Sequence, residues 1–327
     1  MHKKALITGV GGFAMSHVAA ELLDHGWHVV GLDNFSSHGP VALDFGHHPH
    51  FQFIQADAAD PSVLLQLLDG CAHFVAGAAH SGGSQYLREH GYDIYRDNQR
   101  LAEASVEAAL AHMHRGSPVR LTLVSSSMIY ERAERFPVHE TDSLPPPTMA
   151  YGFQKLAAQR LVEAAHRQYG LPYGVLVFFN HAGVGRHVPS QAPRLPEQVL
   201  PDLTRKIMRS ADAVSIRGDG RQLRYFTHGT DLARATRLAL ERPQTQSRVI
   251  QIATDEGTTV EQAARELWQL LRPDQPFRYR SEGPVAGDVQ IQVPDCATAE
   301  ELLGFRARVT LRQILPEIIA AVRQERT

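Results

Sequence analysis

Short apolar runs alternate with amphipathic segments along the first half of the chain. The short runs predict β-strands, and the segments whose apolar residues recur every three or four positions predict α-helices. We expect strands at residues 5–8, 27–32, 51–55, 74–78, 119–125 and 173–179, and helices at 13–25, 61–68, 94–113 and 151–169. Strands that alternate with helices are typical of a parallel sheet with helices on both faces. The pattern therefore predicts an α/β fold around a doubly wound parallel sheet.

The pattern changes after residue 180. A proline-rich loop is expected at 187–196, helices at 200–209, 231–241, 259–271 and 310–324, and short strands at Ile216 and 249–253. These elements predict a smaller, mixed α/β domain that shares segments with the first. We assign residues 1–179 to the first domain, with 216–250 returning to it, and residues 180–215 and 251–327 to the second.

The composition excludes several classes of protein. The 327 residues carry 33 basic and 35 acidic side chains, a formal net charge of -2, and no long basic run, so we expect no nucleic-acid or membrane partner. No apolar stretch is long enough for a membrane span or a signal peptide. The two cysteines, Cys71 and Cys296, form no spaced motif and are typical of a reducing compartment. We therefore predict a soluble cytoplasmic protein.

Histidines are frequent, yet the sequence predicts no metal site. His47, His48 and His50 are close together, but no cysteine or paired carboxylate stands beside them to complete a ligand set. This cluster is interpreted as a polar loop.

A glycine-rich segment, Thr8-Gly9-Val10-Gly11-Gly12-Phe13, follows the first strand and opens the first helix. Glycines at such a turn allow the backbone to approach a pyrophosphate at the helix N-terminus. Asp33 ends the second strand, about 20 residues further on, where a carboxylate binds the hydroxyls of an adenosine ribose. The same carboxylate would repel the additional phosphate of NADP. These features predict a Rossmann-type domain that binds NAD.

Candidate chemistry follows the fifth strand. Tyr151 and Lys155 are four residues apart on a predicted helix, so their side chains share one face. A nearby ammonium group and the positive ring of an oxidised nicotinamide both stabilise a phenolate. Lowering a tyrosine pKa from about 10 to about 7 requires roughly 4 kcal/mol of such stabilisation. We therefore expect Tyr151 to act as a base, with Lys155 and the strand-end Ser126 beside it.

These motifs resemble the extended short-chain dehydrogenase/reductase superfamily, in its nucleotide-sugar epimerase/dehydratase branch. The likeness runs nearly from end to end of the chain. Ser126 stands four residues before Tyr130, which implies that it is the catalytic serine, with Ser127 as the alternative. The resemblance implies that the cofactor is bound by Gly9, Gly12, Phe13, Ala14, Asp33, Asn34, Phe35, Ser36, Asp57, Ala58, Ala78, Asn98, Tyr151 and Lys155.

The resemblance continues in the second half. Asn180 matches an asparagine that contacts the sugar nucleotide, and Arg224, after Gly218-Asp219-Gly220, matches an arginine that binds the substrate diphosphate. A guanidinium suits that role because it forms paired hydrogen bonds to phosphate. Substrate binding is thus expected at Ser126, Ser127, Asn180 and Arg224. Gly287-Asp288, Asp295 and residues 302–304 resemble the family's C-terminal signature.

Four positions depart from the family pattern. Met15 replaces the third glycine of the turn, which predicts a shift of the first helix, and Val177 replaces an arginine. Ala76 or Gly77 stands where a histidine is usual. Met128 lies where 4,6-dehydratases carry an acid that expels the 6-hydroxyl. Because a thioether cannot transfer a proton, this departure disfavours dehydration.

The leading interpretation is a NAD-dependent nucleotide-hexose 4-epimerase that acts through a transient 4-keto intermediate. The alternatives are a nucleotide 4-keto-sugar reductase of the GDP-sugar type, a 4,6-dehydratase and, in another class, a non-catalytic NAD-sensing protein. The resemblance also implies a homodimer that pairs helices 94–113 and 151–169. Its apolar stripe is expected at Leu101, Ala104, Ala108, Met113, Leu161, Ala164 and Ala165.

Overall fold

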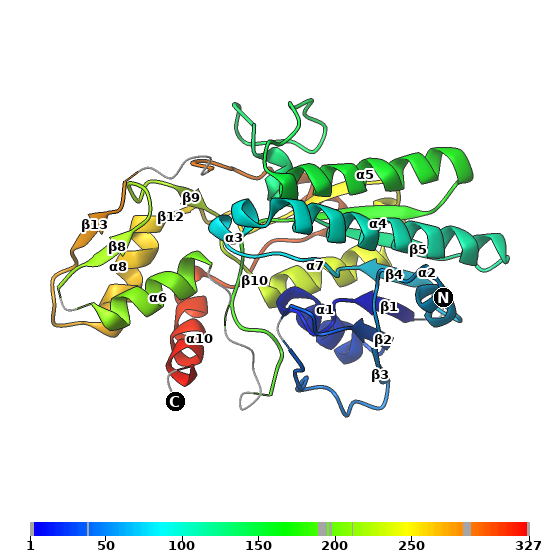
Figure 1. Ribbon diagram of the computed structural model, residues 1–327, viewed down its shortest axis with the longest axis horizontal. Helices are drawn as coiled ribbons and strands as arrows, with labels where there is room; N and C mark the ends of the chain where they lie inside the picture. Colours follow the sequence, from blue (N-terminus) through cyan, green and yellow to red (C-terminus); the bar gives the residue numbers. More distant parts are fainter. Residues whose placement is uncertain are drawn as a thin grey trace.

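A seven-stranded parallel sheet forms the centre of the computed structural model, which describes residues 3–37, 39–188, 195, 198–210, 212–283 and 289–325 (Figure 1). The strand order is β11-β6-β5-β4-β1-β2-β3, and every neighbouring pair is parallel. The strands are β1 (Lys4–Thr8), β2 (His28–Asp33), β3 (Phe51–Gln55), β4 (His73–Ala76), β5 (Arg120–Ser126), β6 (Tyr173–Phe178) and β11 (Val249–Ile252). Each predicted strand of this sheet lies within two residues of its observed bounds. The doubly wound α/β fold is confirmed.

Helices cover both faces of the sheet, because successive strand residues point to opposite sides. In β1, Leu6 joins one core, whereas Ala5 and Ile7 join the other. The first core is closed by α2 (Pro61–Leu67), α4 (Gly91–His114) and α5 (Ala150–Tyr169), and the second by α1 (Phe13–Asp24) and α7 (Gly229–Glu241). The layers can be followed in Figure 1.

Part of the dimer stripe expected from the sequence lies in the first core. Ala104, Ala108 and Ala165 are buried and belong to the first core. Their place in that stripe was wrong, because side chains that are already buried within one chain cannot form a surface for a second one.

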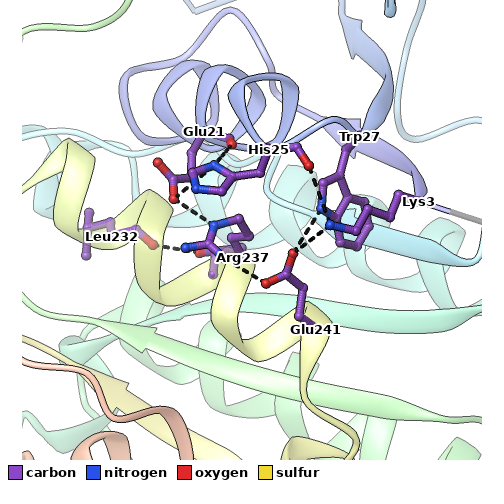
Figure 2. A network of polar contacts seen from close by, with 8 residues as sticks. Lys3, Glu21, His25, Trp27, Leu232, Arg237 and Glu241 are labelled. Carbon is purple, nitrogen blue, oxygen red and sulfur yellow. Dashed lines mark hydrogen bonds and ion pairs between the residues drawn. The ribbon is translucent and has the colours of Figure 1, made fainter. Parts of the chain in front are cut away.

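A polar network fixes α7 to the first helix of the chain (Figure 2). The Arg237 Nε atom donates to Glu21 at 2.8 Å, and its Nη1 atom donates to Glu241 at 2.6 Å. Glu241 also accepts from Trp27 Nε1 at 3.4 Å and from Lys3 Nζ at 3.3 Å. Within the segment 216–250, α7 and β11 thus belong to the layers of the large sheet.

The smaller half packs around a third core. It contains α6 (Val199–Arg209), α8 (Val260–Leu271) and α10 (Leu311–Gln324), whose apolar faces meet at residues such as Ile207, Trp268 and Ile318. Short strands form pairs outside the main sheet: β7 (His181–Ala182) with β10 (Thr227–His228), β8 (Val214–Ile216) with β13 (Tyr279–Ser281), and β9 (Leu223–Arg224) with β12 (Thr258–Thr259). β8 and β9 therefore lie apart from the sheet that α7 and β11 complete.

Several short elements were not predicted. They are α3 (Ser84–Glu89), α9 (Ala297–Leu303), the 3-10 turns η1 (Ser127–Tyr130) and η3 (Pro243–Thr245), the two-residue strands β7, β9, β10 and β12, and β13. Elements of this length show no hydrophobic period, and their pairing comes from tertiary contacts. Among the helices of the described residues, none combines the length and apolarity needed to cross a membrane.

Candidate active site

A cleft of about 1700 Å³ opens where the carboxyl ends of the central strands face the smaller half. Residues of the glycine turn, of β5 and of α5 line one side, and residues of α6, β9 and α10 line the other. Pockets for a single small ligand usually enclose about 300–1000 Å³. The cleft is therefore large enough for a dinucleotide together with a second ligand.

The glycine turn is shaped for close approach to a ligand. Gly9 has φ +77°, and a Cβ at this position would lie 2.8 Å from the Ala78 Cα atom. The Gly9 amide donates to the Leu32 carbonyl at 2.8 Å, and the Gly12 amide donates to the Gly9 carbonyl at 2.9 Å. Only glycine tolerates both this backbone conformation and the neighbouring strand. The turn thus fits a pyrophosphate.

Asp33 connects the turn to the second strand. Its carboxylate accepts from the Gly11 amide at 2.8 Å and from the Phe35 amide at 2.8 Å, and its side chain lines the cleft. These bonds fix the carboxylate at the end of β2, where an adenosine ribose is bound in Rossmann-type folds. The other candidate cofactor residues that line the cleft are Gly12, Phe13, Ala14, Asn34, Ser36, Asp57, Ala58 and Ala78.

Phe35 and Asn98, two candidate cofactor residues, are not among the residues that line the cleft. Phe35 stacks on Phe53 with 5.2 Å between the ring centroids. Asn98 is 3% exposed, accepts from the His80 amide at 2.7 Å and donates to the His80 carbonyl at 2.9 Å. These side chains shape the loops around the cleft.

Ser126, Tyr151 and Lys155 meet in the cleft. Ser126 ends β5 and lies close enough to Tyr151, in the first turn of α5, for its hydroxyl to lower the pKa of the phenol. The Ser126 Oγ atom also accepts from the Met128 amide at 3.3 Å, which starts η1. Lys155 Nζ lies 5.8 Å from the centre of the tyrosine ring and donates to the Val124 carbonyl at 3.1 Å. The fold thus brings the three predicted catalytic candidates together.

Burial sets the charge state of this group in the chain alone. It raises the pKa of Tyr151, and the nearby Ser126 hydroxyl lowers it only in part. Burial also lowers the pKa of Lys155 to about 8. The lowered tyrosine pKa was expected from two cations together, Lys155 and an oxidised nicotinamide, and it stays a prediction for the NAD-bound protein. A further positive charge is needed to make Tyr151 a base near neutral pH.

The substrate-side candidates are held by the backbone. Asn180 has φ +25°, and its Oδ1 atom accepts from the Tyr225 amide at 2.9 Å. Arg224 Nη1 donates to the Val289 carbonyl at 2.8 Å and to the Leu223 carbonyl at 2.9 Å. Both residues line the cleft, as does Ser127. Gly287-Asp288 of the C-terminal signature lies outside the described residues.

Some residues of the cleft carried no assignment from the sequence. His181 stacks on Phe13 at 5.3 Å, and its Nε2 atom lies 2.9 Å from Gln198 Nε2. Burial lowers the pKa of His181 to about 4, so this ring is neutral at physiological pH. Gln292 enters from the segment before α9, and no motif in the sequence marks it. Its position next to Ser127 depends on tertiary structure alone.

Met15 packs against Gly77. Met15 is 3% exposed, and a Cβ at position 77 would overlap its Cγ and Sδ atoms. The missing side chain at 77 therefore leaves the space that the thioether of Met15 fills. Two of the departures from the family pattern compensate each other at this point.

Metal ligation finds no support in the described part of the chain, where no group of three or more histidine, cysteine or acidic side chains could hold an ion. His50 instead stacks on His28 with 4.1 Å between the ring centroids.

Comparison with known proteins agrees with this geometry. The profile of the NAD dependent epimerase/dehydratase family matches residues 5–253. The UDP-glucose 4-epimerase of Corynebacterium glutamicum is 27% identical over 96% of this chain and 94% of its own length. A trifunctional UDP-glucose 4,6-dehydratase/UDP-4-keto-6-deoxy-D-glucose 3,5-epimerase/UDP-4-keto-L-rhamnose-reductase of Arabidopsis thaliana is 28% identical over 83% of this chain and 40% of its own length.

The fold is also shared with a solved structure. The crystal structure of UDP-glucose 4-epimerase with UDP-glucose from Thermotoga maritima matches with a TM-score of 0.81 and 27% identity, over 99% of this chain and 100% of that one. The glycine turn and Asp33 fit the cofactor that the family name specifies. The chain belongs to the NAD dependent epimerase/dehydratase family, and its cofactor is NAD.

Proposed function

We propose that this protein is a nucleotide-hexose 4-epimerase. The observation that carries the proposal is the meeting of Ser126, Tyr151 and Lys155 in one cleft that Arg224 also lines. The names of the relatives support the same reaction class, because several of them are UDP-glucose 4-epimerases.

The residues divide the binding task between the two sides of the cleft. The glycine turn and Asp33 would hold the pyrophosphate and the adenosine ribose of NAD. Arg224 would hold the diphosphate of the substrate, since its guanidinium is oriented by two backbone carbonyls. Asn180, which lines the same cleft, would contact the nucleotide sugar. The hexose then lies over Ser126 and Tyr151.

The chemistry at C4 requires one proton acceptor. Tyr151 takes the proton of the 4-hydroxyl, and Ser126 holds the same oxygen by a hydrogen bond. When bound, NAD would supply the hydride acceptor and donor for C4, and its oxidised ring would add the positive charge that Tyr151 lacks in the chain alone. Lys155 would hold the nicotinamide ribose. Tyr151 gives the proton back to the 4-keto oxygen as the hydride returns to the other face of C4, so the reaction has no net consumption of cofactor.

Dehydration is not part of the proposal. The acid position after Ser127 is occupied by Met128, which lines the cleft and cannot move a proton. A 4-keto-sugar reductase remains the alternative that uses the same three residues, and it would release its cofactor in every cycle.

A substrate screen tests the proposal. Purified protein is incubated separately with UDP-, GDP-, dTDP- and CDP-hexoses, and products are separated by chromatography and weighed by mass spectrometry. We expect an isomer of unchanged mass from at least one sugar, with NAD retained through purification. Net NADH formation, a 4-keto-6-deoxy product or no turnover of any sugar would contradict the proposal.

We also propose a homodimer formed through α4 and α5. These helices expose aromatic rings on their outer side: Tyr92 is 77% exposed and Phe153 is 43% exposed. Exposed aromatic residues of this kind are common at interfaces between proteins.

We keep the cytoplasm as the proposed location, because Cys71 and Cys296 are both unpaired thiols.

A further inference from the structure

A short extended segment, residues 289–293, connects the substrate side of the cleft with the catalytic candidates. At its start, the Val289 carbonyl accepts from Arg224 Nη1 at 2.8 Å, and the Gln290 carbonyl accepts from the Leu223 amide at 2.8 Å. At its end, the Val293 carbonyl accepts from the Val138 amide at 2.8 Å. The segment is thus attached to β9 at one end and to the loop after η1 at the other.

Gln292 is the side chain of this segment that reaches the catalytic strand. It is 5% exposed, lines the cleft, and donates from Nε2 to the Ser127 carbonyl at 2.9 Å. Ser127 follows Ser126 directly and begins η1. The amide of Gln292 therefore holds the backbone at the point where Ser126 turns toward Tyr151.

The loop that receives the end of the segment is itself fixed. Gln251 at the end of β11 donates from Nε2 to the Val138 carbonyl at 2.8 Å and accepts from the Asp295 amide at 3.2 Å. The Asp295 amide also donates to the Val138 carbonyl at 3.2 Å. These bonds anchor this end of the segment to the large sheet.

We propose that Gln292 is a positioning residue that transmits the occupancy of the nucleotide site at Arg224 to Ser126. When a diphosphate binds to Arg224, the guanidinium takes a fixed position, and so do the Val289 carbonyl that it contacts and the segment 289–293. Gln292 then holds the Ser127 carbonyl so that Ser126 and Tyr151 face the hexose. The inference rests on the proposed function, since it assumes that Arg224 binds a diphosphate and that Ser126 contacts the hexose.

The test compares Gln292→Met, which keeps the length of the side chain and removes the donor, with Ile291→Met on the exposed neighbouring side chain. The NAD-loaded full-length proteins are titrated with UDP, GDP, dTDP and CDP, and backbone hydrogen exchange of residues 121–130 is measured with and without each nucleotide. Steady-state kcat and KM are measured with whichever nucleotide sugar the wild type converts.

In the wild type and in Ile291→Met, the nucleotide should slow exchange in residues 126–130. In Gln292→Met, we expect the nucleotide to bind with a Kd within about threefold of wild type but without slowing that exchange, and KM to stay similarly unchanged. The value of kcat should fall by about tenfold to a hundredfold, as for a small misplacement of a reacting group.

Two kinds of failure can be told apart. If the wild type binds a nucleotide and Gln292→Met behaves like Ile291→Met, the inference is overturned while the proposed function stands. If Gln292→Met loses nucleotide affinity, Gln292 contacts the ligand directly and the positioning role is overturned. If none of the four nucleotides binds the wild type, the proposed function and the inference both fall. If a nucleotide binds but no sugar is converted, the proposed function falls, and the exchange measurement alone decides whether Gln292 transmits the occupancy of the nucleotide site.

Discussion

Replacing Gly77 by alanine tests whether Met15 is accommodated by the missing side chain beneath it. A Cβ at position 77 would overlap the Cγ and Sδ atoms of Met15 and lie 3.0 Å from the Thr8 carbonyl oxygen. Because Met15 is buried beside the glycine turn, relief of this overlap requires its thioether to leave the position in which the core now packs it. We expect Gly77→Ala to lower the free energy of unfolding by about 1–3 kcal/mol, the usual cost of overpacking a core.

A double-mutant cycle with Met15→Ala measures the coupling between positions 15 and 77. The single change Met15→Ala removes a buried side chain, and such changes cost about 2–5 kcal/mol of unfolding free energy in protein cores. We expect a cost near the lower value, because Met15 also lines the open cleft. In the double variant, the new methyl group at 77 occupies part of the space that Met15 leaves. The two changes should therefore cost at least about 1 kcal/mol less together than the sum of their separate costs.

Urea unfolding of the NAD-free proteins gives these free energies, and the variants are compared when their m-values are equal. Gly91→Ala is the matched control, because its new methyl group would meet only the Ala150 Cβ atom at an ordinary 3.4 Å. The reasoning is refuted if Gly77→Ala is within about 0.5 kcal/mol of wild type, or if the two changes prove additive within that margin.

The other predictions concern the cofactor, the catalytic group and the assembly. Tyr151→Phe should reduce turnover by about 10² to 10⁴ and leave NAD bound, because the ring and Lys155 remain; activity within a few-fold of wild type would show that Tyr151 is not the base. NAD should bind more tightly than NADP, because the Asp33 carboxylate is fixed at the ribose position by the Gly11 and Phe35 amides; titration of both dinucleotides checks this, and equal dissociation constants would contradict it. Burial holds the pKa of Lys155 at about 8, below its value in the unfolded chain, so the unfolded state binds more protons between those two values. The stability of wild type relative to Lys155→Met should therefore rise with pH above about 8, by at most about 1.4 kcal/mol per pH unit, and a flat difference from pH 7 to pH 10 would exclude the buried ammonium. Light scattering at micromolar concentration should give about twice the 36.2 kDa mass of one chain, and a single-chain mass would refute the dimer.

The local pattern of apolar and polar residues was sufficient to predict the strands of the large sheet. It was also sufficient to predict that the candidate catalytic residues lie at the carboxyl end of β5. Buried parallel strands such as β5 and β6 are short apolar runs bounded by polar loops, and this signal gave their bounds to within two residues. Ser126, Tyr151 and Lys155 were found for a related reason, since the end of a strand and one turn of a helix are local features.

The rest of the site depends on contacts between distant parts of the chain. Gln292 reaches Ser127 across 165 residues, and a glutamine in an irregular segment has no local signature. The pKa of Tyr151 likewise follows from burial, which the four-residue spacing to Lys155 does not report. Met15 was interpreted alone as the cause of a shift of the first helix, because Gly77, whose missing side chain makes room for it, is 62 positions away and becomes its neighbour only through the pairing of β1 with β4.

The return of α7 and β11 to the large sheet has a consequence for how the chain is made. Arg237 contacts Glu21 across 216 residues, and Val249 pairs with Val175 at the edge of β6. Until the ribosome has released residues 229–252, the apolar side of α1 and the free edge of β6 lack their native cover. Exposed strand edges and apolar helix faces invite association between nascent chains. Synthesis of this protein therefore passes through a long interval in which about two-thirds of the chain is present but its sheet is open, and holdase chaperones that bind apolar segments should engage it during that interval.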